Sequence, residues 1–117
     1  MNMQQILVID DDRDMRYLLL RYLKKKDFDV VEADSGKAAL ALLEPCQPNL
    51  ILCDFKLGDM TGNALLKEVK LRFPAIPFII ITGYADIRIA VEAMKLGAFD
   101  YVIKPLIPDE ILLTIQR

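Results

Sequence analysis

The sequence predicts an α/β fold in which a parallel β-sheet carries helices on both faces. Short apolar runs alternate with amphipathic stretches five times along the 117 residues, which is the pattern of repeated βα units. The longest apolar runs span five or six residues, as buried parallel strands do, and are far too short to cross a membrane. With 54% apolar residues, the chain can build one domain with its own core.

The first half of the chain predicts two βα units from its apolar spacing and its capping residues. The first unit is a strand at 5–9 and a helix at 13–26. The apolar face of that helix is formed by Met15, Leu18, Leu19, Tyr22 and Leu23. The second unit is a strand at 28–33 and a helix at 36–44, which Ser35 is expected to cap and Pro45 to end.

The second half predicts three more units by the same reasoning. A strand leading to Asp54 precedes a helix at 62–73, and a strand leading to Thr82 precedes a helix at 87–96 that Gly97 ends. The apolar stripe of the helix at 62–73 is Leu65, Leu66, Val69 and Phe73. The last strand, at 100–103, leads to Lys104, and a final helix begins at Pro108 and still continues at Arg117. We therefore expect residues 1–117 to be one domain taken from a longer protein.

Composition argues against several classes of function. A net charge of −2 without a basic tract gives no support to direct nucleic-acid binding. The chain has no histidine, so the usual general base and the commonest zinc ligand are missing. No basic segment followed by an apolar one opens the chain, so we expect a cytoplasmic protein without a membrane interaction. Cys46 and Cys53 are expected to be reduced thiols, with Cys53 directed into the core.

Polar residues follow four of the predicted strands at the point where each strand ends. They are Asp10 and Asp11, Asp54, Thr82, and Lys104. In open α/β sheets the carboxyl ends of the strands form the ligand-binding edge. We therefore expect three acids, one hydroxyl and one ammonium to converge there.

The charges of these groups predict a site for a divalent cation and a phosphoryl group. Asp10, Asp11 and Asp54 carry −3 and Lys104 carries +1, so the site needs a charge of about +2 to become neutral. Oxygen ligands favour Mg²⁺, for which Mn²⁺ can substitute. An ionised carboxylate is a nucleophile that needs no general base, and phosphoryl transfer depends mainly on positioning and charge neutralisation. Asp54 is therefore a candidate phosphoacceptor, with Thr82 and Lys104 contacting the phosphoryl oxygens.

Four segments of the sequence carry a family resemblance. They are Ile6-Leu7-Val8-Ile9-Asp10-Asp11-Asp12, Asp54-Phe55-Lys56-Leu57-Gly58-Asp59-Met60-Thr61-Gly62, Ile81-Thr82-Gly83-Tyr84, and Gly97-Ala98-Phe99-Asp100-Tyr101-Val102-Ile103-Lys104-Pro105. With these segments the chain resembles, along its whole length, the receiver domains of two-component response regulators. The segment from Thr82 to Gly97 is most similar to receivers joined to AAA+ sigma-54 activators or to small helix-turn-helix regulators.

The resemblance implies a fold and a set of site residues. The fold is a doubly wound (βα)5 flavodoxin-like sandwich with strand order 2-1-3-4-5. Asp54 is the implied phosphoacceptor, and Asp10 and Asp11 form the acidic pocket. The implied Mg²⁺ ligands are Asp11, Asp54 and the backbone carbonyl of Lys56, with Asp10 in the same cluster. Thr82 and Tyr101 are the implied switch pair.

The resemblance also implies partners and a mode of action. The phosphoryl group is expected to come from a histidine kinase, and the receiver is expected to control an output domain, in keeping with transcriptional regulation. The surface formed by the fourth helix, the fifth strand and the fifth helix is the element that switches. A homodimer formed through that surface on phosphorylation is a candidate assembly. The only enzymatic activity implied is the domain's own phosphorylation and slow dephosphorylation.

The chain departs from the family pattern in the loop after Asp54. Gly58 stands where the family usually has proline, so this loop is expected to be looser. Lys56 and Tyr84, each two residues after a site residue, occupy positions that modulate dephosphorylation in the family.

Two other interpretations remain open at this point. A haloacid-dehalogenase-type phosphatase also uses an aspartate and Mg²⁺, and Asp10-Asp11-Asp12 contains its D-x-D spacing. That family wants Thr or Val where Asp14 stands, and an acidic pair where Lys104 is followed by Pro105-Leu106-Ile107. The other is a receiver that only binds partners and is never phosphorylated, but such a protein would usually have lost one of the five site residues.

Overall fold

The structure, a computed structural model, describes residues 4–83 and 86–116, in which five parallel strands form one sheet. The strand order is β2-β1-β3-β4-β5, so the expected order is confirmed. The strands are β1 (Gln5–Ile9), β2 (Asp29–Ala33), β3 (Leu50–Asp54), β4 (Phe78–Thr82) and β5 (Asp100–Ile103). Tyr84, predicted at a position that modulates dephosphorylation, lies outside the described residues.

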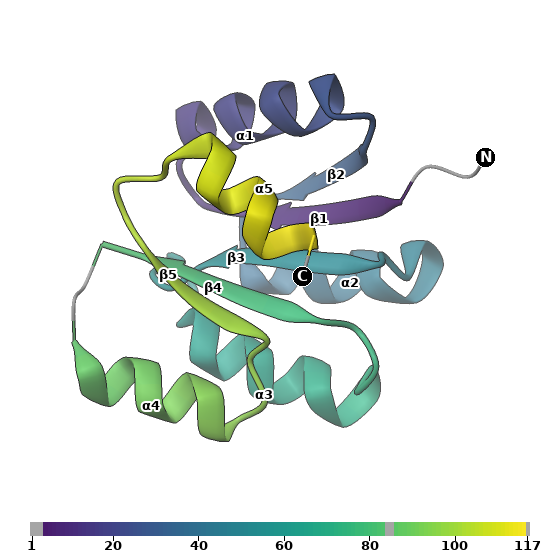
Figure 1. Cartoon of the computed structure of the whole chain (residues 1–117). Coiled ribbons are helices and arrows are strands. Elements are labelled where there is room, and N and C mark those ends of the chain that lie inside the picture. The colour runs from purple at the N-terminus through teal and green to yellow at the C-terminus, as the bar shows by residue number, and fades with distance from the viewer. Residues whose placement is uncertain (1–3, 84–85, 117) are drawn as a thin grey trace.

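Helices cover both faces of this sheet, as the sequence predicts (Figure 1). The helices are α1 (Arg13–Lys25), α2 (Gly36–Cys46), α3 (Gly62–Arg72), α4 (Ile87–Lys95) and α5 (Pro108–Gln116). Helices α1 and α5 pack on one face through a cluster that includes Leu19, Leu23 and Ile111. Helices α2, α3 and α4 pack on the other face. None of the helices in the described part of the chain is long and apolar enough to cross a membrane.

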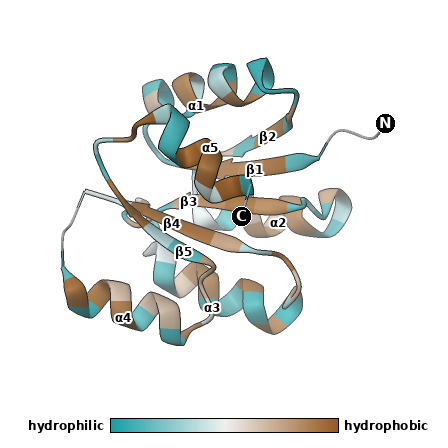
Figure 2. Ribbon diagram, viewed as in Figure 1, coloured by the Kyte–Doolittle hydropathy of each residue, from teal (hydrophilic) through white to brown (hydrophobic). Residues whose placement is uncertain are grey.

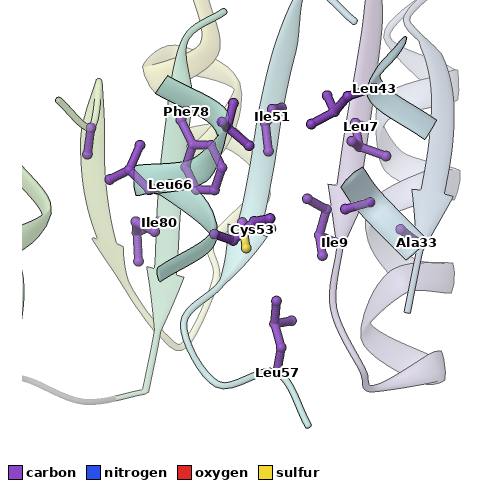
Figure 3. Close-up of a cluster of buried hydrophobic side chains, with 14 of the residues drawn as sticks. Leu7, Ile9, Ala33, Leu43, Ile51, Cys53, Leu57, Leu66, Phe78 and Ile80 are labelled. Carbon is purple, nitrogen blue, oxygen red and sulfur yellow. The ribbon is translucent and has the colours of Figure 1, made fainter. Parts of the chain in front are cut away.

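The core is densest around the two central strands β3 and β4, in which every residue is buried. Hydrophobic residues run along these strands between the helix layers (Figure 2). On the face covered by α2 and α3, Phe78 packs with Leu66 and Cys53 in one cluster (Figure 3). Cys53 is fully buried and not in a disulfide, so its predicted inward direction is confirmed. Burial raises the pKa of this thiol well above its ordinary value, so it stays protonated.

Two sequence predictions about helices are wrong in detail. Pro45 does not end α2 but lies in its last turn, and the helix ends one residue later at Cys46. Proline costs a helix one backbone hydrogen bond, to the carbonyl four residues earlier, and here Gln47 closes the final turn by donating to the Leu43 carbonyl. Leu18, expected on the buried face of α1, is 61% exposed. By contrast, Ser35 caps α2 as predicted, since its hydroxyl accepts a bond from the Ala38 amide.

The register of the sheet brings the predicted site residues to one edge. Ile9 pairs with Cys53, so the next residues, Asp10 and Asp54, lie side by side at the carboxyl edge of the sheet. Asp54 pairs with Ile81, directly before Thr82. Thr82 pairs in turn with Ile103, and the Lys104 amide donates to the Thr82 carbonyl at 2.7 Å. Parallel pairing therefore assembles the site from four strand ends.

Candidate phosphoacceptor site

A cavity of about 460 Å³ lies at the carboxyl edge of the sheet. Its lining consists of Asp10, Asp11, Asp12, Asp54, Lys56, Thr82, Gly83 and Lys104. The cavity thus gathers every acid, hydroxyl and ammonium that the sequence placed at this edge.

Asp54 is held from both of its carboxylate oxygens. Its Oδ1 lies 2.9 Å from Nζ of Lys104 in an ion pair, and its Oδ2 accepts a 3.2 Å hydrogen bond from the Lys56 backbone amide. The residue is only 7% exposed. Burial alone lowers the pKa of Lys104, but the hydrogen bond and charge of Asp54 outweigh it and raise the net pKa. Lys104 therefore stays charged beside the carboxylate.

The acidic cluster is unequal in its contact with solvent. Asp10 is buried and Asp11 is exposed. One carboxylate oxygen from each of Asp10, Asp11 and Asp54 lies within 4.8 Å of the others, close enough to share one metal ion. Burial, followed by the charges of Asp54 and Asp11, raises the pKa of Asp10 to about 6, although the Asp12 amide and Lys104 oppose this. Folding therefore disfavours the ionised form of Asp10.

Thr82 and Tyr101, the predicted switch pair, lie in contact on neighbouring strands. Thr82 is 1% exposed and Tyr101 is half-buried. Burial raises the pKa of the Tyr101 phenol, whereas a hydrogen bond with the Thr82 side chain lowers it. The two side chains therefore meet directly, at the border between the cavity and the surface of β5.

The loop after Asp54 is fixed by residues that the sequence reasoning did not single out. Asp59 accepts hydrogen bonds from the backbone amides of Gly36 and Lys37 at 3.0 and 2.9 Å, which ties the loop to the start of α2. At Gly62 a Cβ atom would lie 2.9 Å from the Asp54 carbonyl. Gly58, which stands where the family usually has proline, has no atom within 4 Å of an added Cβ. The loop is therefore held by the contacts of Asp59 and Gly62 and not by Gly58 itself. The sequence offers one signal for this arrangement, Thr61-Gly62 at the start of α3, and none for the contacts of Asp59.

The fold and the acidic cavity at the edge of the sheet point to a signalling domain, and comparison with known proteins shows its family. Residues 6–116 match the response regulator receiver domain. The chain belongs to this family, the receiver domains of two-component systems.

Relatives and solved structures agree with this assignment. The transcriptional regulatory protein ZraR of Escherichia coli is 42% identical over 112 residues, covering 96% of this chain and 25% of the relative. NtrC of Salmonella typhimurium, a DNA-binding transcriptional regulator, is 38% identical and covers 96% of this chain and 24% of the relative. A CheY-like receiver from Methanospirillum hungatei superposes with a TM-score of 0.95 at 32% identity, over 98% of this chain and 92% of that one. The chain thus spans about a quarter of the length of the curated relatives it matches.

Proposed function

We propose that Asp54 accepts a phosphoryl group from the phosphohistidine of a kinase, and that residues 1–117 are the amino-terminal receiver of a longer regulator. The observation that carries the proposal is the 2.9 Å ion pair between Asp54 and Lys104, set beside the acidic cluster. In the transfer, a bond forms between an Asp54 oxygen and phosphorus while the phosphorus–nitrogen bond to the kinase breaks. Apart from this transfer and the slow hydrolysis of the resulting acyl phosphate to the carboxylate and inorganic phosphate, no enzymatic activity is proposed.

Each residue around the cavity has a distinct role in this proposal. A carboxylate attacks phosphorus directly, so phosphoryl transfer to Asp54 needs no general base. The Lys104 ammonium can form an ion pair with one oxygen of the new phosphoryl group, and the Thr82 hydroxyl can donate a hydrogen bond to a second oxygen. Phosphorylation changes the charge at Asp54 from −1 to about −2 and adds acceptor oxygens. Thr82 is therefore drawn toward the phosphoryl group, and its bond with Tyr101 has to rearrange.

The donor set of the acidic cluster fits Mg²⁺ or Mn²⁺. Its carboxylates are hard oxygen ligands, and the exposed side of Asp11 leaves the cluster open to water. Asp11, Asp54 and the Lys56 carbonyl would hold the ion, with Asp10 beside them. When bound, the ion neutralises negative charge on the transferring phosphoryl group.

The output of the switch is proposed to pass through the α4–β5–α5 surface. Its exposed apolar residues are Ile87, Val91, Met94, Ile103, Ile107 and Leu113. This surface would control an output domain, in a transcriptional regulator of the sigma-54 activator type, or pair with a second phosphorylated copy. A cytoplasmic location follows if the phosphoryl donor is a histidine kinase.

Phos-tag electrophoresis and intact mass after treatment with acetyl phosphate and Mg²⁺ test this function. One added phosphoryl group is expected, and Asp54→Asn, which has the same shape, should show none. Equal labelling in excess EDTA would contradict the role of the cation. Absence of labelling under all conditions would favour a receiver that is never phosphorylated, and steady turnover of p-nitrophenyl phosphate would favour a phosphatase.

A further inference from the structure

Asn63 is a buried polar residue that the phosphoryl-transfer chemistry does not use. It is the second residue of α3 and is 3% exposed. Its side-chain Nδ2 donates to Oε1 of Glu92 at 2.9 Å and to the backbone carbonyl of Ile89 at 3.3 Å. Both acceptors belong to α4, so one amide group on α3 holds the neighbouring helix at its middle.

The direction of the Asn63 amide is fixed by these partners. A carbonyl and a carboxylate can only accept, so the NH₂ group must face α4. No donor from residues 4–83 or 86–116 reaches Asn63 Oδ1, which is buried. A buried amide with an unsatisfied oxygen is costly, and an apolar side chain would avoid that cost. The residue therefore contributes a directed contact to α4 rather than general core packing.

Helix α4 has few other buried contacts. Ala93 is its only buried residue, and Ile87, Val91 and Met94 are 77%, 45% and 50% exposed. Figure 2 shows hydrophobic residues along this outlying helix. A helix with little buried apolar surface is held weakly by the hydrophobic effect. Two hydrogen bonds, one of them to a charged acceptor, are thus a large share of what fixes its position.

Asn63 is separated by one residue, Gly62, from the loop that follows Asp54, residues 55–61, here called the phosphoacceptor loop. The amide of Gly62 donates to the Phe55 carbonyl at 2.6 Å, and Gly62 packs against the Asp54 carbonyl. A continuous path of contacts therefore runs from Asp54 through Gly62 and Asn63 to α4. The other path, from Thr82 along the chain, passes through residues 84 and 85, which lie outside the described part of the chain.

We propose that Asn63 is the positioning residue of α4: its amide ties the helix to α3, and the helix can shift only when the bonds to Glu92 and Ile89 break. The proposal deepens the proposed function, because phosphorylation at Asp54 has to work against this tie. Removing the tie leaves the phosphoacceptor site intact but makes displacement of α4 easier.

Hydrogen exchange of the α4 amides, in the unphosphorylated protein, tests the tie through a double-mutant cycle. Glu92→Ala should speed exchange across 88–95 by about three- to tenfold, the range expected for losing one ordinary hydrogen bond, because the Glu92 side chain lies at the surface. Glu92→Gln keeps an acceptor oxygen and should restore most of the protection. In an Asn63→Ala background the effect of Glu92→Ala should nearly vanish, because the two residues act as one contact. Equal effects of Glu92→Ala in both backgrounds would overturn the proposal.

A titration with beryllofluoride and Mg²⁺ tests the consequence for switching. If the tie opposes the shift of α4, Asn63→Ala should bind this phosphoryl mimic about three- to tenfold more tightly than the native chain. Unchanged affinity would overturn the claim that phosphorylation works against the tie. If the native chain binds no beryllofluoride, the proposed function fails, and the exchange cycle still decides the role of Asn63.

Discussion

Helices α3 and α4 lie side by side on one face of the sheet but are held there very differently (Figure 1). Helix α3 buries Gly62, Asn63, Leu65, Leu66 and Val69, whereas α4 buries Ala93 alone. The anchored helix follows the phosphoacceptor loop directly, and the loosely held one carries exposed apolar residues toward solvent. The site is thus built on rigid elements, and the element beside it has little buried surface to resist movement.

This difference implies that the two helices open at different free energies. Elements with a buried apolar face exchange their amides only when the whole domain unfolds, whereas weakly packed ones open locally. We expect α3 amides to report global unfolding and α4 amides to report local opening with α3 still folded. A change in α3 that removes no contact with α4 should then leave α4 exchange unaltered, because it destabilises α3 equally whether α4 is closed or open.

The largest expected effect comes from truncating the core of α3. Leu66→Ala removes a fully buried side chain that packs near Phe78 (Figure 3) and should lower the free energy of unfolding by about 2–5 kcal/mol. The matched change on α4, Ile87→Ala at a 77% exposed position, should stay within about 0.5 kcal/mol. Urea unfolding measures both. Similar losses for the two variants would show that α4 is anchored as firmly as α3.

Ionisation of Asp10, which lies beside Asp54 at the carboxyl edge of the sheet, should have the next largest effect on the free energy of unfolding. The folded pKa of Asp10 is about 6 against an ordinary 3.8, so the folded state holds this proton more tightly than the unfolded state does. The stability that the group contributes is present below about pH 4 and is lost as pH rises through about 6. The loss amounts to up to about 3 kcal/mol, because each tenfold difference in proton affinity between the two states corresponds to about 1.4 kcal/mol.

Asp10→Asn isolates this effect from the other titrating groups. The variant should be more stable than the native chain at pH 7, and the difference should close as pH falls toward 4. Asp11→Ala, at an exposed position of the same cluster, should give a smaller gain. Unfolding curves of the three proteins between pH 4 and 7 measure this, and a pH-independent difference for Asp10→Asn would count against a raised pKa.

Millimolar Mg²⁺ should raise the melting temperature of the native chain but not of Asp11→Ala.

The sequence predicts the strands and the edge where they meet better than the contacts between side chains of different elements. Apolar runs that end in Asp10, Asp54 and Thr82 are enough to predict buried parallel strands whose ends meet at one edge, because the geometry of a parallel sheet leaves little choice. The burial of Asp10 and the exposure of Asp11 could not be read from two adjacent aspartates. Their difference depends on where the backbone turns after β1.

The contacts that fix the loop and α4 were missed for a related reason. Asp59 binds amides at the start of α2, and Asn63 binds α4, across 22 and 29 residues of sequence respectively. No local pattern marks a side chain whose partner lies on another element. Pro45 was wrongly expected to end α2 because a rule for helix interiors was applied in the last turn, where a single lost hydrogen bond is tolerated.

Gly62 offers a sharper test of how α3 is joined to the phosphoacceptor loop. In Gly62→Ala the new methyl group would lie 2.9 Å from the Asp54 carbonyl and 3.1 Å from Ile80 Cδ1. The backbone carbonyl cannot rotate away like a side chain, so a loss of about 1–3 kcal/mol in unfolding free energy is expected. Gly58→Ala, with no atom within 4 Å of the added Cβ, is the control and should change little. A neutral Gly62→Ala would mean that the loop moves freely relative to α3.

The smallest expected effect compares the amino-terminal caps of the two helices. Thr61 caps α3 by accepting a hydrogen bond from the Ala64 amide at 3.1 Å, and Asp86 caps α4 by accepting one from the Arg88 amide at 2.9 Å. Thr61→Ala should lower the unfolding free energy by about 1 kcal/mol and speed exchange in α3. It should leave α4 exchange unaltered, because α3 lacks its cap equally when α4 is closed and when α4 is open. Asp86→Ala should speed exchange in both helices, because it destabilises the folded α4 and therefore favours both local opening of α4 and global unfolding. Exchange followed by mass spectrometry on peptides covering 62–72 and 87–95 separates the two patterns. If Thr61→Ala speeds α4 exchange as much as α3 exchange, the two helices open together and the contrast in their anchoring has no thermodynamic consequence.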